Sequence, residues 1–165
     1  MRLTSYTNYA LRTLMFAALA APELVRVQDV AAAHGISRTH LVKCVHRLGR
    51  WGYLENLRGR GGGFRLARPA ETITVGEIVR HTEEGFAETG ASAGDDEVEA
   101  RLVATFERAQ AAFLAVLDAH TIRDVVVDGG ALRAALGLDG PAPAYAEAPL
   151  DPTISAIVDP PSTRA

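Results

Sequence analysis

The sequence predicts a mainly α-helical protein with one small β-hairpin: a winged helix-turn-helix domain followed by a long dimerisation helix. Three observations lead to this fold class. Two short helical segments flank a glycine-containing turn, a glycine-rich hairpin with arginines follows them, and residues 96–119 carry an apolar stripe of helical period. The 165 residues, 48% of them hydrophobic, suffice for one compact domain with an added helical arm.

Three helices are expected first, over residues 4–20, 28–34 and 38–50. Apolar residues at three-and-four spacing predict the first of them. Gly35 ends the second helix, because glycine readily adopts the left-handed conformation found at helix ends. Ser37 then stands at the start of the third helix, where a hydroxyl side chain is favoured as a cap. Helix, short glycine turn and helix form the helix-turn-helix pattern.

A β-hairpin is expected directly after the third helix. Residues 53–57 and 64–66 are strand-like, and the run 58–63 between them is rich in glycine and carries two arginines. A hairpin in this position is the wing of a winged helix.

The second half of the chain is predicted to form helices over residues 74–82, 96–119 and 121–130. A capping-box spacing opens the first of these, and six of the eight prolines fall between residues 141 and 161. We therefore divide the chain into a winged helix-turn-helix domain (1–82), a loop (83–95), the dimerisation helix with a following short helix (96–130) and a proline-rich, flexible tail (131–165).

The charge of the chain is divided unevenly between its two parts. Residues 1–68 hold eleven basic and three acidic residues, whereas residues 69–165 hold six basic and seventeen acidic ones, so a net charge of −3 conceals a balance of +8 against −11. A basic half joined to an acidic half suggests that only the first half meets a polyanion.

The third helix and the wing are expected to bind DNA. Helical spacing puts Leu41, Val45 and Leu48 on a buried line and turns the polar and basic residues of this helix, His46 included, away from it. Such a face suits the major groove, with Thr39 and His40 reading bases, while arginines and small glycines on a hairpin suit phosphates or a narrow groove. The alternative is a merely solvated helix face. The expected DNA-binding residues are Gln28, Ser37, Arg38, Thr39, His40, Lys43, Arg47, Arg50, Arg58, Arg60, Gly61, Gly62 and Arg65.

The apolar stripe of the long helix is wider than a small domain needs, so we expect it to pack against the same helix of a second copy. The alternative is packing on its own winged helix alone. The expected interface residues are Val98, Leu102, Phe106, Ala109, Phe113, Val116 and Leu117.

Cys44 is the only cysteine, which excludes an internal disulfide and a cysteine-only metal site in one chain. Its position near the buried line favours a half-buried packing role. The alternative is a redox thiol, because Lys43 and Arg47 lie close and favour the thiolate. The five histidines show no metal-ligand spacing, and no metal site is expected.

Five segments carry a family resemblance: residues 3–12 (LTSYTNYALR), 34–37 (HGIS), 41–43 (LVK), 52–54 (GYL) and 58–64 (RGRGGGF). In this order they resemble the Rrf-two family of bacterial winged-helix repressors, and within it the nitric-oxide-sensitive and iron–sulfur cluster regulators. The resemblance covers about residues 1–128. It implies a homodimer built on the long helix and transcriptional control from a palindromic operator.

The resemblance also implies an iron–sulfur cluster, which many members hold with three cysteines ahead of the long helix. Here Ala100 stands where the last cysteine is expected, and Ala91 lies near the position of the first. Alanine has no donor atom, and thiolates are the usual cluster ligands. Asn8 occupies a position that supplies another ligand in relatives, but an amide is a poor iron ligand. We therefore expect no cofactor, either in a cluster-free member or because the cysteines were replaced.

The function predicted from the sequence is that of a homodimeric, sequence-specific transcriptional regulator, a repressor, that binds a palindromic site in double-stranded DNA. The alternatives are a winged-helix protein-interaction module and a thiol-based redox sensor acting through Cys44. An enzyme is not expected, because we find no nucleophile–base pair and no phosphate-binding loop that opens a helix. A membrane span and a secretory signal are not expected either, which points to the cytoplasm.

Overall fold

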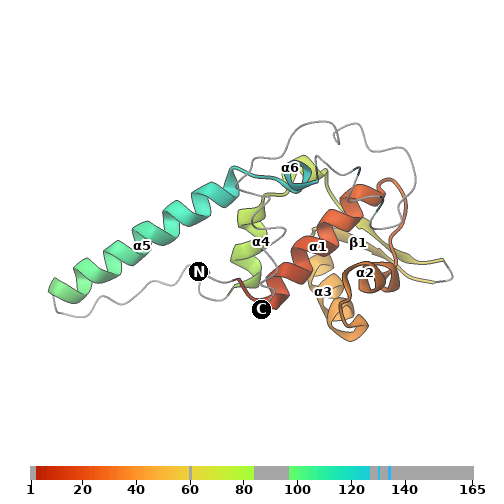
Figure 1. The fold of residues 1–165 in the computed structure, drawn as a ribbon, viewed down its shortest axis with the longest axis horizontal. Helices are drawn as coiled ribbons and strands as arrows, with labels where there is room; N and C mark the ends of the chain where they lie inside the picture. Colours follow the sequence, from red (N-terminus) through yellow and green to blue (C-terminus); the bar gives the residue numbers. More distant parts are fainter. Residues whose placement is uncertain (1–2, 60, 84–96, 127–129, 131–133, 135–165) are drawn as a thin grey trace, which may run out of the picture.

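The structure of the chain, a computed structural model, describes residues 3–59, 61–83, 97–126, 130 and 134 (Figure 1). The predicted fold class, mainly helical with a two-stranded antiparallel sheet, is confirmed. Apart from Glu83 and Ala134, the predicted loop 83–95 and tail 131–165 lie outside the described residues, as do Arg60 and Ala91. The elements are α1 (Ser5–Ala20), α2 (Val27–His34), α3 (Arg38–Arg50), β1 (Leu54–Leu57), β2 (Gly63–Leu66), a 3-10 turn η1 (Ala70–Thr72), α4 (Val75–Thr82), α5 (Glu97–Asp118) and α6 (Ile122–Val125).

The turn between α2 and α3 has the expected form. Gly35 is left-handed, with φ of 62°, and its N–H donates to the carbonyl of Ala31. Ser37 is the residue before α3, but its hydroxyl forms no capping hydrogen bond; its carbonyl accepts from the Leu41 N–H at 3.1 Å. The Ser37 hydroxyl is therefore left exposed at the start of α3.

The wing is held by three segments and not by two. Strands β1 and β2 pair antiparallel from Leu54 opposite Leu66 to Leu57 opposite Gly63. In addition, Val25 pairs with Phe64 through two backbone hydrogen bonds of 2.8 Å each, a pairing that no local sequence pattern predicts. A Cβ on Gly63 would lie 2.5 Å from the Val25 carbonyl oxygen, so only glycine lets these backbones approach so closely.

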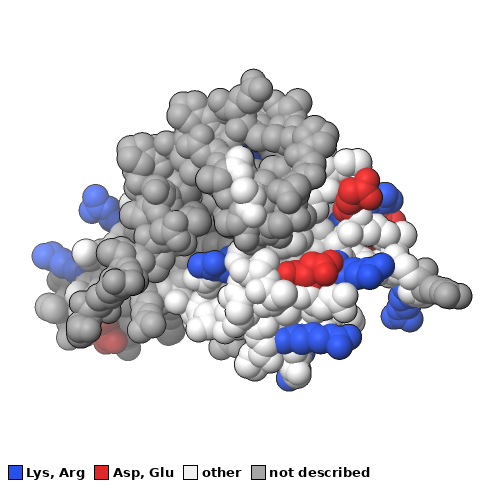
Figure 2. Space-filling view, turned by 45° about the vertical axis from the view of Figure 1, so that its right-hand side comes forward, with Lys and Arg blue, Asp and Glu red and all other residues white. Residues whose placement is uncertain are grey.

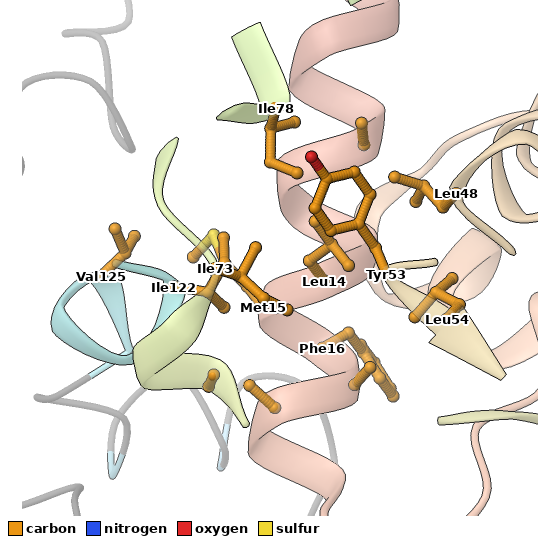
Figure 3. Packing of buried hydrophobic residues seen from close by; sticks show 14 of the residues in the cluster. Leu14, Met15, Phe16, Leu48, Tyr53, Leu54, Ile73, Ile78, Ile122 and Val125 are labelled. Carbon is orange, nitrogen blue, oxygen red and sulfur yellow. The ribbon is translucent and has the colours of Figure 1, made fainter. Parts of the chain in front are cut away.

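Helix α1 runs through the centre of the core. Its residues Leu14, Met15 and Phe16 contribute to a buried cluster that also contains Tyr53 and Ile78 from other parts of the chain (Figure 3). Helices α2, α3, α4 and α6 and strand β2 all contact α1.

The carboxyl end of α5 and helix α6 belong to this same core. Thr74 pairs with Thr121, and the Ile122 N–H donates to the carbonyl of Ile73 at 2.8 Å. Leu114 and Leu117 are buried with them. Leu117, only 4% exposed, therefore lies in the core of its own protomer and not on the predicted dimer face, because the last turns of α5 fold back against α4.

The rest of α5 leaves the domain as a projecting helix (Figure 1). Leu102, Phe106 and Val116 are 56%, 66% and 51% exposed, Ala109 is exposed, and Phe113 is half-buried against the core. The side chain of Val98 lies outside the described part of the chain. An exposed run of large apolar side chains along one helix is unusual on the surface of a monomer.

The base of α5 is fixed to α4 by a bidentate ion pair. The two terminal guanidinium nitrogens of Arg80, Nη1 and Nη2, donate to the carboxylate of Asp118 at 2.7 and 2.5 Å, and these hydrogen bonds hold the pKa of Asp118 below its usual value. Gly76 permits the contact, because a Cβ there would lie 2.0 Å from a carboxylate oxygen of Asp118. The direction in which α5 projects is thus set by α4.

The start of α1 is fixed to the end of α4 in a similar way. The carboxylate of Glu83 accepts hydrogen bonds from the Thr4 N–H at 2.7 Å, from the Thr4 hydroxyl at 2.9 Å and from the Thr7 hydroxyl. Burial acts to raise the pKa of Glu83, but these hydrogen bonds together outweigh it, and the pKa lies below its usual value. Glu83 therefore belongs structurally to the winged helix.

Candidate nucleic-acid interface

Helix α3 presents a polar and basic face opposite its buried line. Leu41, Cys44, Val45 and Leu48 are buried against α1 and the hairpin, as the helical spacing predicts. The exposed residues directly opposite them are Thr39, Lys43, His46 and Arg50. Successive members of this set are three or four residues apart, so they form one strip along the helix.

The wing adds a second basic element to the same surface. Arg50 of α3 and Arg58 of the β1–β2 turn line one open pocket of about 370 Å³, which lies between α3, the hairpin and the start of α2. Within the part of the chain that the structure describes, no acidic side chain pairs with Lys43, Arg50 or Arg58. Figure 2 shows Lys and Arg side chains on the side of the molecule where α3 and the hairpin lie.

Gly49 lets the wing approach α3 closely. A Cβ on Gly49 would lie 2.1 Å from the side-chain nitrogen of Asn56 on β1. That nitrogen donates to the carbonyl of Val45 at 3.5 Å. A glycine inside a helix lowers helix stability, so its place here is explained by the contact it permits.

Two of the predicted DNA-binding residues lie on the flank of α3 that faces α1. The ring of His40 stacks on Tyr9 with 6.3 Å between centroids, and the guanidinium of Arg47 lies 5.5 Å from the ring centroid of Tyr6. Both side chains remain exposed, but their orientation is set by the two tyrosines. Helical spacing predicts that His40 and Arg47 point away from the buried line. The contacts with Tyr9 and Tyr6 follow from the packing of α1 against α3.

The remaining predicted DNA-binding residues differ in their exposure and in their contacts within the protein. Gln28 and Arg38 are exposed at the starts of α2 and α3, whereas Arg65 forms an exposed ion pair of 2.8 Å with Glu55. Gly61 has φ of 85° and faces open space. A Cβ on Gly62 would lie 2.4 Å from the Leu57 carbonyl oxygen, so the fold of the turn itself requires this glycine.

Sequence reasoning missed several residues of this surface, among them Val42 and Asn56. Val42 is 49% exposed on α3 and lines the pocket, and Asn56 lines it from β1. Helical spacing places Val42 off the buried line, but its apolar side chain does not match the polar and basic pattern expected of a DNA-binding face. Asn56 gave no such signal, because its place depends on the pairing of the hairpin with α3.

Cys44 is more deeply buried than the sequence suggests. Its exposed fraction is 0%, and burial raises the pKa of the thiol to about 11, because the nearby Thr13, Tyr6 and Arg47 side chains offset only part of the desolvation. The neighbouring Arg47 has the smallest influence of these groups. Arg47 does favour the thiolate, as expected, but desolvation of the buried thiol outweighs its effect.

We expect Cys44 of the folded protein to react slowly with N-ethylmaleimide. At pH 7.5 a pKa raised from 9.0 to about 11 reduces the thiolate fraction by about 100-fold, and burial slows the reaction further. The measurement compares alkylation rates in buffer and in urea. Rapid alkylation of the native protein, together with loss of an oxidant response in Cys44→Ser, would revive the redox-thiol hypothesis.

The residues near the expected cluster position do not fit a cysteine-ligated cluster. Ala100 lies on α5 and has no donor atom, and Cys44 is enclosed in the core. The amide oxygen of Asn8 accepts a hydrogen bond of 2.6 Å from Arg12. Among the described residues, no group of three or more His, Cys, Asp or Glu side chains could hold a metal ion.

Comparison with known proteins identifies the family. The model of the Rrf2 family, described as an iron-dependent transcriptional regulator, matches residues 3–128. The chain is 48% identical over 143 residues to the HTH-type transcriptional regulator NsrR of Geobacillus kaustophilus (strain HTA426), covering 82% of this chain and 97% of that relative. It is 40% identical over 148 residues to protein aau3 of Rhizobium meliloti (strain 1021), covering 86% and 95%.

Solved structures share the fold. The cysteine regulator CymR (YrzC) of B. subtilis superposes with a TM-score of 0.64 at 22% identity, over 76% of this chain and 95% of that one. IscR of T. potens gives 0.64 at 23%, over 81% and 91%. None of the described helices is long and apolar enough to cross a bilayer. From the family match and the relatives, the chain belongs to the Rrf2 (Rrf-two) family and is a DNA-binding transcriptional regulator, not an enzyme.

Proposed function

We propose that this regulator is a cytoplasmic homodimer that represses transcription by binding a palindromic operator, and that it does so without an iron–sulfur cluster. One observation carries the proposal: Arg50 of α3 and Arg58 of the wing line the same open pocket, with Lys43 on the adjoining strip of α3. A helix and a hairpin that present cations side by side can bind a DNA duplex, with α3 in the major groove and the wing along the phosphate backbone.

The projecting part of α5 supports the homodimer. Leu102, Phe106 and Ala109 fall within about 60° of one another at 100° per residue, and all three are exposed. A second copy would present the same stripe, so a two-fold interface buries both at once. Two symmetric heads then require two symmetric half-sites about one helical turn apart.

The salt dependence of binding tests this proposal. A DNA duplex is first selected from a random pool with the purified protein, and its dissociation constant is then measured at five salt concentrations. Three phosphate contacts from each protomer, through Lys43, Arg50 and Arg58, predict a slope of about −5 in log affinity against log salt. We expect the slope of Arg50→Ala to be less steep by about 2, because the dimer loses one phosphate contact from each protomer.

The matched control is Arg123→Ala. Arg123 is an exposed cation on α6, away from α3 and the wing, so its removal changes the net charge but no expected phosphate contact. The slope should stay within about half a unit of the parent's. A flat salt dependence in the parent, or equal losses in both variants, would contradict the assignment of the interface.

Iron and sulfide analysis after anaerobic purification tests the cluster-free state. The proposal rests on Ala100 and on the single, buried cysteine, since cluster iron is normally held by thiolates. We expect less than about 0.1 iron per chain and the same DNA affinity with and without a chelator. Stoichiometric iron with matching sulfide would overturn this part of the proposal.

A further inference from the structure

The pocket between α3 and the wing has an apolar floor that the proposed phosphate contacts leave unused. Val27, Val42 and Val45 line it, and His46, Arg50, Asn56 and Arg58 form the rest of the lining. Val45 is buried and Val27 half-buried, but Val42 is 49% exposed. An apolar side chain so exposed, in the middle of a polar and basic face, is not explained by the packing of the protomer.

Val42 is placed where a recognition helix meets base edges. It is the fifth residue of α3 and lies one turn after Thr39, on the side of the strip nearest the wing. Base contacts of helix-turn-helix proteins come from the amino-terminal part of the recognition helix. The cations Arg50 and Arg58 line the same pocket and suit the phosphates that border a groove.

The apolar side chains that line the pocket favour contact with one kind of group on a DNA base. The major-groove edges of guanine, cytosine and adenine offer hydrogen-bonding groups, and thymine adds a C5 methyl group. Valine side chains neither donate nor accept hydrogen bonds, and the side-chain nitrogen of Asn56 is already directed to the Val45 carbonyl. Of the groups in the groove, only a methyl group gains from contact with this floor.

We propose that Val42 is a specificity-determining residue that receives the C5 methyl of one thymine in each half-site. This inference rests on the proposed binding of a palindromic duplex. Removing one buried methyl group corresponds to roughly a fourfold loss of affinity, and to about 15-fold when both half-sites lose it.

The experiment replaces single thymines of the selected duplex by uracil, symmetrically in both half-sites. Uracil lacks only the methyl group, so the hydrogen bonds and the shape of the duplex are retained. We expect one thymine position at which the parent protein binds about 15-fold more weakly after replacement. At that position Val42→Ala should bind the thymine and uracil duplexes within a factor of two of each other, while other methyl-sensitive positions keep their effect in this variant.

Two further measurements separate the methyl contact from other causes. Replacing the same base pair by cytosine–guanine and then by 5-methylcytosine–guanine should weaken binding and then recover a part of it in the parent, but not in Val42→Ala. Val42→Thr keeps nearly the same side-chain volume but has a hydroxyl in place of one methyl group, so it should keep only part of the thymine preference. Circular dichroism checks that the variants fold. We expect them to fold, because Val42 is exposed and its replacement disturbs little of the core.

The outcomes distinguish this inference from the function on which it rests. If the protein binds no duplex from the pool, the proposed function fails and the inference fails with it. If it binds a palindromic duplex, but no thymine position shows a methyl effect that Val42→Ala abolishes, the inference alone is wrong. A methyl effect that Val42→Ala and Val42→Thr leave unchanged likewise assigns the contact to another residue.

Discussion

Replacing Lys43 and Arg58 together by glutamate should abolish specific DNA binding without unfolding the protein. Both side chains are exposed, and neither is paired with an acidic side chain among the described residues, so the fold loses little. On the duplex, four phosphate contacts per dimer are replaced by four repulsions. We expect affinity for the selected duplex to fall on the order of a thousandfold at moderate salt, measured by fluorescence anisotropy.

The control for this prediction changes the charge by the same amount elsewhere. Arg108 on α5 and Arg123 on α6 are exposed and lie away from α3 and the wing. Their replacement by glutamate should weaken binding less than about tenfold, through the long-range field alone. Equal losses in the two double variants would mean that net charge, and not this surface, determines binding. Unchanged binding in the first variant would favour the protein-interaction module.

Phe106→Glu should separate the two protomers. Phe106 is the most exposed large apolar residue among those described, at 66%, and it lies in the middle of the stripe on α5. Two carboxylates facing each other in an apolar interface carry a large desolvation cost. We expect a monomer in analytical ultracentrifugation at micromolar concentration, and a loss of 100-fold or more in affinity for the two-half-site duplex, because the linkage between the two heads is removed.

Two controls accompany this variant. Ala104→Glu introduces the same charge at an exposed position on the other side of α5 and should leave a dimer. A duplex with a single half-site should bind Phe106→Glu and the parent with similar affinity, since α3 and the wing are untouched. A dimeric Phe106→Glu protein would show that the stripe is not the interface, and weakened single half-site binding would reveal an effect on the head itself.

The sequence predicted those features that are set by a few neighbouring residues. Gly35 ends α2 where expected, α3 spans residues 38–50 as predicted, and Thr74 and Glu77 form the capping box that opens α4. Each of these signals acts within one turn of helix, so it does not depend on the rest of the fold. The hairpin followed in the same way, because its glycines adopt backbone conformations that other residues rarely take.

The surroundings of α3 required the tertiary structure. The thiol of Cys44 is fully buried, Tyr6 and Tyr9 flank Arg47 and His40, and Val42 is left open beside the wing. Helical periodicity gives the direction of each side chain from the axis, but it does not say which element lies in that direction.

The sequence by itself thus determined most of the helices, the hairpin, the uneven charge and the family. The last predicted helix, 121–130, is shorter in the structure, because α6 ends at Val125 with Val126 as its C-cap. Only the tertiary structure decided that Val25 joins the wing, that Leu117 belongs to the core, and that Arg50 and Arg58 share one pocket. The physical reason is the range of the interactions. Caps and turns are formed by residues a few positions apart, whereas these contacts join residues distant along the chain through the shape of the packed core.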